Sequence, residues 1–281
     1  MSISLPRRVA RAVRRRLFQR PVRPLAPIVF TGDYASWDEA KAASDGYESS
    51  VILDRTTAAL LKVKRGDAVY ERDSVVMDQP EYPFPVIAAL LRAASINGGR
   101  LTVLDFGGSL GSTYFQCRKL LAGVARVEWL VVEQPGHVAR GRQLFEDNGL
   151  RFFLSPEECL QRYRPNALLL SGVLQCLPDP HGTLRSLMAL RVPHLIIDRT
   201  AFYRGNRDRL TVQAVPEWIY PASYPSWFLS ESKLTSAIAD AGYRLVVDFK
   251  GTDDLSPLDA PGSGYYKGFV FDLRTPGAQA A

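Results

Sequence analysis

A strand, a glycine-rich turn and a helix are predicted over residues 101–121 (LTVLDFGGSLGSTYFQCRKLL). The apolar strand, residues 101–104, ends on an acid, and the helix is expected from about Ser112. This order aims the free N–H groups and the positive end of the helix at whatever lies over the turn. The sequence therefore predicts a site for a polar or anionic group, with candidate residues Asp105, Gly107, Gly108, Ser109 and Gly111.

A second acid ends the next predicted strand, residues 127–132 (VEWLVV). This acid is Glu133, and Gln134 follows it. The second strand of a βαβ unit ends beside the first turn, where an acid can accept both hydroxyls of a ribose. The pair of acids favours an adenosine-containing cofactor, although Glu133 could instead cap the following helix.

Three known uses of a strand, turn and helix fit these residues less well. A phosphate loop needs a Lys that is missing after Gly111, and a dinucleotide fingerprint needs a glycine at position 106, which is Phe. GGSLG is a literal GxSxG, the nucleophile elbow of a serine hydrolase, with Ser109 as nucleophile. That chemistry needs a histidine late in the chain, and the last one is His194. A serine hydrolase stays an alternative.

A fourth pattern matches more positions. Asp105, Gly107, Ser109 and Gly111 resemble the DxGxGxG motif of class I S-adenosylmethionine-dependent methyltransferases, with Ser in place of the middle Gly. The resemblance implies that S-adenosyl-L-methionine is the cofactor and that these residues, with Gly108, Glu133, Gln134 and Ser171, bind it. A cofactor-binding scaffold protein without catalysis is a further alternative.

Four segments extend the resemblance: VLDFGGSLGSTYF, WLVVEQP, LLLSGVLQCLPDP and LIIDRTAFY. In this order they resemble an uncharacterised family of methyltransferases found among bacterial surface-polysaccharide genes, from about Phe30 to Leu273. The resemblance implies a cytoplasmic enzyme that methylates a hydroxyl of a sugar, glycan or other small precursor.

The order of predicted elements indicates an α/β fold. Helices and strands alternate after Glu133, which is typical of a doubly wound Rossmann-like sheet with five parallel strands. Two last strands without an intervening helix must be antiparallel, which gives seven strands with the last one reversed. We expect a basic tail and Pro-rich linker over residues 1–28, a helical N-terminal cap over 29–99 and the catalytic domain over 100–275.

Ligands of such sheets lie outside the carboxyl ends of the strands. Ser171 and Gln175 follow the fourth predicted strand, and Asp198 and Arg199 end the fifth. Asp198 could deprotonate a hydroxyl, Arg199 and Gln175 could bind the substrate, and His181 is the histidine best suited to act as a base. An Asp–Arg pair that merely orders the loop, or a helix-start histidine, would explain the same residues.

Residues 200–229 are rich in aromatic residues and proline, and we expect a long loop there. Aromatic side chains beside polar groups suit a sugar ring or the interface of a homo-dimer.

The net charge of +6 belongs to the N-terminus. Residues 1–23 hold eight Arg and no acid, with Leu5, Val9, Val13 and Leu17 at helical spacing. This pattern suits either a helix in peripheral contact with the inner face of an anionic membrane or a solvated arm. Because the rest of the chain is not basic, we expect no nucleic-acid partner.

Metal chemistry and disulfides are not expected. The three Cys are far apart and form no CxxC, and the three His form no HxH or HExxH. No apolar run has the length of a membrane span.

Overall fold

The computed structural model describes residues 27–45, 49–77, 79, 81–251 and 262–274. The basic tail and most of the Pro-rich linker lie outside these residues, so their expected roles stay predictions. None of the helices in the described ranges has the length and apolar character that a membrane span requires.

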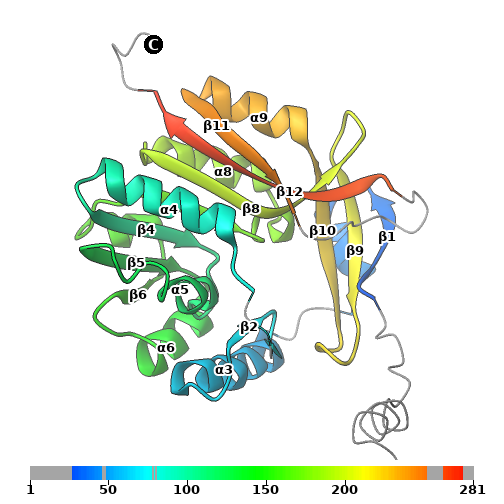
Figure 1. Cartoon of the computed structure of the whole chain (residues 1–281). Coiled ribbons are helices and arrows are strands. Elements are labelled where there is room, and N and C mark those ends of the chain that lie inside the picture. Colours follow the sequence, from blue (N-terminus) through cyan, green and yellow to red (C-terminus); the bar gives the residue numbers. More distant parts are fainter. Residues whose placement is uncertain (1–26, 46–48, 78, 80, 252–261, 275–281) are drawn as a thin grey trace, which may run out of the picture.

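A seven-stranded sheet forms the centre of the molecule (Figure 1). Its strand order is β6-β5-β4-β7-β8-β12-β11; β4 to β8 run parallel and β12 is antiparallel to β8 and to β11. The expected Rossmann-like sheet with a reversed last strand is thus confirmed. The strands are β4 (Arg100–Phe106), β5 (Arg126–Val132), β6 (Leu150–Phe153), β7 (Ala167–Ser171), β8 (His194–Tyr203), β11 (Tyr243–Lys250) and β12 (Gly264–Leu273).

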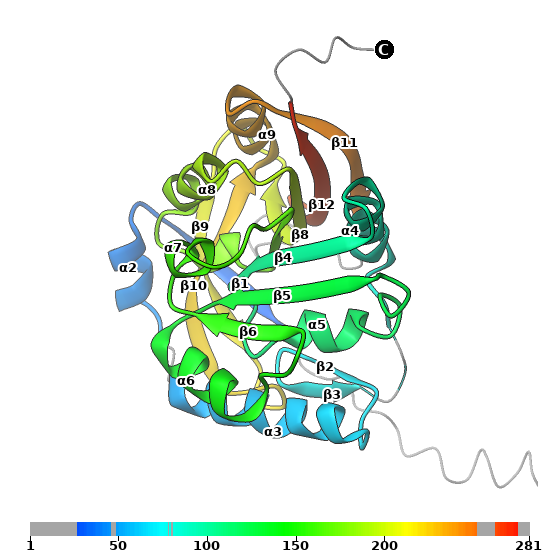
Figure 2. The same ribbon diagram turned by 90° about the vertical axis from the view of Figure 1, so that its left-hand side faces the viewer.

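Helices cover both faces of this sheet (Figure 2). Consecutive strand residues such as Val103 and Leu104 point to opposite faces and are both fully buried, which is why the strands are apolar throughout. One face packs on α3 (Ser49–Arg65), α4 (Phe84–Ile96), α5 (Ser112–Cys117) and α6 (Pro135–Leu144). The other packs on α7 (Pro156–Leu160), α8 (Pro180–Ala189) and α9 (Glu231–Asp240), with the short 3₁₀ helix η1 (Leu174–Cys176) after β7.

Three further strands lengthen the sheet to ten and correct two expectations; they are antiparallel to one another, and the last of them pairs in parallel with β8. The segment expected as a long loop, residues 200–229, contains the end of β8, then β9 (Arg209–Val215) and β10 (Ala222–Ser230). The N-terminal cap is not purely helical, because β1 (Val29–Tyr34) pairs with β9. It also holds the hairpin of β2 (Tyr70–Arg72) and β3 (Val75–Met77), beside the expected α2 (Trp37–Ala42), α3 and α4.

Candidate functional site

The glycine-rich bend joins β4 to α5. Gly107 and Gly111 have φ of +74° and +90°, and Ser109 has φ of +53°, a left-handed value that L residues rarely adopt. A Cβ on Gly107 would lie 2.3 Å from Cγ2 of Val173. The bend therefore needs glycine at position 107, because backbone conformation and packing both require it.

Asp105 lies beneath this bend. Its carboxyl is 1% exposed, and its Oδ2 accepts a hydrogen bond of 2.7 Å from Nε1 of Trp129. A Cβ on Gly108 would lie 2.4 Å from the same oxygen. Burial raises the pKa of Asp105 to about 7, although the indole hydrogen bond opposes this shift.

Glu133 follows the neighbouring strand, on the other side of the bend. Its Oε2 accepts a hydrogen bond of 2.7 Å from the backbone N–H of Gln134 and lies 4.0 Å from Nδ1 of His137. Within the described part of the chain, no residue donates a hydrogen bond to its Oε1. Glu133 thus has one oxygen that holds the carboxylate in place and one that is available to a ligand.

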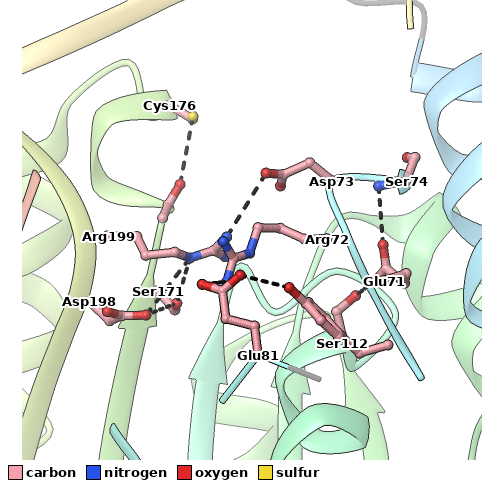
Figure 3. A network of polar contacts seen from close by, with 12 residues as sticks. Glu71, Arg72, Asp73, Ser74, Glu81, Ser112, Ser171, Cys176, Asp198 and Arg199 are labelled. Atoms are coloured by element: carbon pink, nitrogen blue, oxygen red, sulfur yellow. Dashed lines mark hydrogen bonds and ion pairs between the residues drawn. The ribbon is translucent and has the colours of Figure 1, made fainter. Parts of the chain in front are cut away.

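The ends of β7 and β8 bring three further candidates together (Figure 3). Oγ of Ser171 donates to Oδ2 of Asp198 over 2.8 Å, and Nε of Arg199 donates to Oγ of Ser171 over 3.3 Å. Asp198 and Arg199 do not end their strand as expected, since β8 continues to Tyr203.

Most of these groups line one cavity of about 650 Å³. Its lining includes most of the site residues predicted from the sequence, namely Asp105, Gly107, Gly108, Ser109, Glu133, Gln134, Ser171, Asp198 and Arg199.

Three predicted residues do not line this cavity. Gly111 is the N-cap of α5 and packs near Leu150. Gln175 is buried, and its Nε2 donates to the backbone carbonyl of Arg199 over 3.1 Å, so it supports the site from behind. His181 begins α8, where Nε2 lies 3.1 Å from Oδ2 of Asp208, and this location does not favour a role as catalytic base.

The β2–β3 hairpin forms a wall that sequence reasoning missed. Its residues Glu71, Arg72, Asp73 and Ser74 line the cavity. Glu71 is 4% exposed and accepts hydrogen bonds from Oγ of Ser112 and from the backbone N–H of Ser74. Burial raises its pKa to about 7. The only indication of this hairpin in the sequence is a pair of short β-prone runs on either side of Asp73–Ser74, and such a pattern predicts a hairpin only weakly.

An aromatic wall, which Val75 of the hairpin contacts, completes the cavity. Tyr220 and Tyr224, whose hydroxyls lie 3.4 Å apart, line it together with Pro225 and Trp37. Burial raises the pKa of Tyr220 to about 12, so this phenol is neutral at physiological pH. In the described ranges, no group of three or more His, Cys, Asp or Glu side chains is placed to hold a metal ion.

No protein-family model and no curated protein matches this chain. Solved structures that it resembles include the N-terminal domain of EvdMO1 with SAH bound, at 17% identity over 66% of this chain and 81% of that one, with a TM-score of 0.43. Another is the Burkholderia thailandensis 1,6-didemethyltoxoflavin-N1-methyltransferase, at 17% identity over 82% and 91% and a TM-score of 0.38. A third is magnesium protoporphyrin IX methyltransferase (ChlM) from Synechocystis PCC 6803, at 12% identity over 82% and 98% and a TM-score of 0.45. Such remote likeness carries no argument about the reaction, which has to be inferred from the residues of the cavity.

Proposed function

We propose that this protein is an S-adenosyl-L-methionine-dependent methyltransferase. The observation that carries the proposal is the pair of acids, Asp105 and Glu133, at the ends of adjacent strands on either side of a bare backbone bend in one cavity. A second support is the strand order, in which the antiparallel β12 lies between β8 and β11.

The residues present fit this cofactor. Oε1 of Glu133 is available for ribose hydroxyls, and Gln134 lies beside it. Leu154, after β6, is 54% exposed and lines the cavity, where its apolar side chain suits the face of an adenine. The buried carboxyl of Asp105 suits the ammonium of the amino-acid end, because a nearby cation would favour its ionised form.

Bound S-adenosylmethionine would supply a methyl group that its sulfonium already activates, so the chain's task is positioning and exclusion of water. Ser171 would lie beside the cofactor. Asp198, held by the Ser171 hydroxyl, would accept the proton of an attacking hydroxyl. Tyr220 and Tyr224 line the cavity, and an aromatic side chain there would pack on the C–H face of a sugar ring, which suits a sugar, glycan or other small precursor as acceptor.

The serine hydrolase is less well supported. Ser109 does have the left-handed backbone that a nucleophile elbow requires. However, among the described residues no hydrogen bond joins its hydroxyl to a histidine. We place the protein in the cytoplasm, with its Arg-rich N-terminus in peripheral contact with the inner membrane face, and a homo-dimer fits the same proposal.

Calorimetric titration with S-adenosylmethionine and S-adenosylhomocysteine tests the cofactor. Glu133→Gln should weaken binding at least about tenfold, since the amide loses a charge-assisted hydrogen bond. Glu128→Gln is the matched control, because Glu128 is on the same strand but pairs with Arg126 outside the cavity. If neither molecule binds the unaltered protein, the proposal fails.

Transfer of a labelled methyl group to a panel of sugars and nucleotide sugars then tests the reaction. Binding of the cofactor with no transfer to any acceptor would favour the scaffold role over the enzyme.

A further inference from the structure

The backbone of Arg199 is held in an unusual conformation by its neighbours. Its φ is +47°, and β8 bulges there: three steps of β8, from Ile197 to Thr200, lie opposite two steps of β12. A left-handed backbone at a residue that is not glycine costs on the order of 1 kcal/mol. The buried amide of Gln175 holds it there by donating to the Arg199 carbonyl. The effect is to turn the Arg199 side chain out of the strand pattern and into the cavity.

No carboxylate lies within hydrogen-bond distance of the Arg199 guanidinium, although Asp73, Asp198 and Glu71 all interact with its charge. Its nitrogens lie 3.8 Å from Oδ2 of Asp198 and 3.9 Å from Oδ2 of Asp73, and the one hydrogen bond, from Nε to Ser171, is 3.3 Å long. Within the described ranges, Nη1 and Nη2 donate no hydrogen bond. By contrast, both terminal nitrogens of Arg92 in α4 donate hydrogen bonds, of 2.8 and 2.6 Å, to the carboxylate of Asp272.

The turn of the β2–β3 hairpin supplies Asp73, one of the acids that face Arg199 (Figure 3). Asp73 and Ser74 form a two-residue turn with φ of +50° and +70°. The side chain of Asp73 is 63% exposed, so it can turn into solvent without losing a buried contact. The Asp73 carboxylate therefore occupies the position where an anionic ligand of Arg199 would bind, and such a ligand can displace it.

We infer that the acceptor carries a carboxylate or phosphate group, which binds the two terminal nitrogens of Arg199 in place of Asp73. The inference rests on the proposed function and narrows its acceptor to an anionic molecule. Guanidinium binds either group through two parallel hydrogen bonds. Arg199 is in β8, and two strands, β7 and β4, separate β8 from β5, which Glu133 follows. If Glu133 holds the ribose, Arg199 would therefore lie away from the ribose, on the side where the acceptor would enter.

Titration of the protein saturated with S-adenosylhomocysteine tests the inference. Inorganic phosphate and acetate are the probes, with sodium chloride keeping the ionic strength constant. The unaltered protein should bind at least one probe, and Arg199→Gln should weaken this binding about tenfold or more, whereas Arg199→Lys should retain part of it. Asp73→Asn should tighten it about fivefold, because it removes a competing charge near 4 Å in a partly hydrated site. Arg140→Gln, which affects an arginine paired with Asp54 outside the cavity, should change nothing.

The outcomes separate the two proposals. Failure of S-adenosylhomocysteine to bind defeats the proposed function, and the same titration on the free protein still tests the anion site. If S-adenosylhomocysteine binds but neither probe does, or if Arg199→Gln binds the probes as well as the unaltered protein, the inference is overturned. It is also overturned if the probes compete with S-adenosylhomocysteine and Arg199→Gln weakens the latter, since Arg199 would then hold the carboxylate of the cofactor. A melting midpoint within a few degrees of the unaltered protein shows that Arg199→Gln is folded.

Discussion

Replacing Glu71 with glutamine should stabilise the protein at neutral and alkaline pH. Glu71 is 4% exposed, and its two hydrogen bonds come from Ser112 and from the backbone N–H of Ser74. Glutamine can keep both, with its carbonyl toward Ser74 and its NH₂ toward the Ser112 hydroxyl, which can also accept. The substitution therefore removes a charge that burial disfavours and changes little else.

The magnitude follows from the pKa, which burial raises from 4.5 to about 7. Because the folded state binds the proton more tightly than the unfolded chain, stability falls as pH rises from about 4.5 and levels off above about 7. Each pKa unit is worth about 1.4 kcal/mol, so the loss is about 3 kcal/mol by pH 8.5. Glu71→Gln has no such loss.

Urea unfolding of both proteins between pH 4.5 and 8.5 measures the effect. The free energies of unfolding should be similar at pH 4.5 and differ by about 3 kcal/mol in favour of Glu71→Gln at pH 8.5. Glu81→Gln is a control of opposite sign. Burial raises the pKa of Glu81, but the hydrogen bonds from Tyr70 and Arg72 outweigh burial and lower this pKa. Above about pH 4.5, Glu81→Gln should therefore be less stable than the unaltered protein. A difference between wild type and Glu71→Gln that does not change with pH would refute the reasoning.

Three further predictions concern the bend, the reaction and the core. Gly107→Ala should abolish binding of S-adenosylhomocysteine in calorimetry, and adding Val173→Ala should restore it only in part, because the clash is relieved but the left-handed backbone, which costs on the order of 1 kcal/mol in an L residue, remains. Asp198→Asn should leave that binding within about twofold and lower turnover about 100-fold if Asp198 is the base, whereas unchanged turnover removes it from the reaction. Arg92→Leu should cost about 3 kcal/mol in urea unfolding at pH 7, since it leaves the carboxylate of Asp272 with fewer partners. Burial opposes the lowered pKa of Asp272 but is outweighed by Arg92 and His194, so this cost should shrink as pH falls below about 4.

The parts of the site that depend on neighbouring residues in the sequence were predictable. The bend at Gly107 and the acid at position 133 each follow an apolar strand, and parallel strands end at one edge of a sheet, so sequence order alone brings them together. The N-cap of α7 was equally local, with Oγ of Ser155 accepting from the N–H of Glu158.

The parts that depend on distant pairing were not predictable. Pro225 favours a loop, yet it lies in β10, which pairs with β9 along its length and with β8 only at Leu229 and Ser230. The proline is tolerated because the strand has no second neighbour at that position. The sequence of residues 29–34 does not indicate that they pair with β9. The position of Glu71 in the cavity wall likewise depends on how the hairpin packs on α5.

The pairing of β1 with β9 has a consequence for synthesis. In β1, Phe30 is 2% exposed because it packs on Ala201 and Phe228, which a ribosome adds long after it. A nascent chain therefore carries an unpaired strand with an exposed phenylalanine through most of its elongation, and such surfaces recruit chaperones and favour aggregation of unfinished chains. Slower translation ahead of Arg209 would prolong that exposure, whereas release of the finished chain would end it.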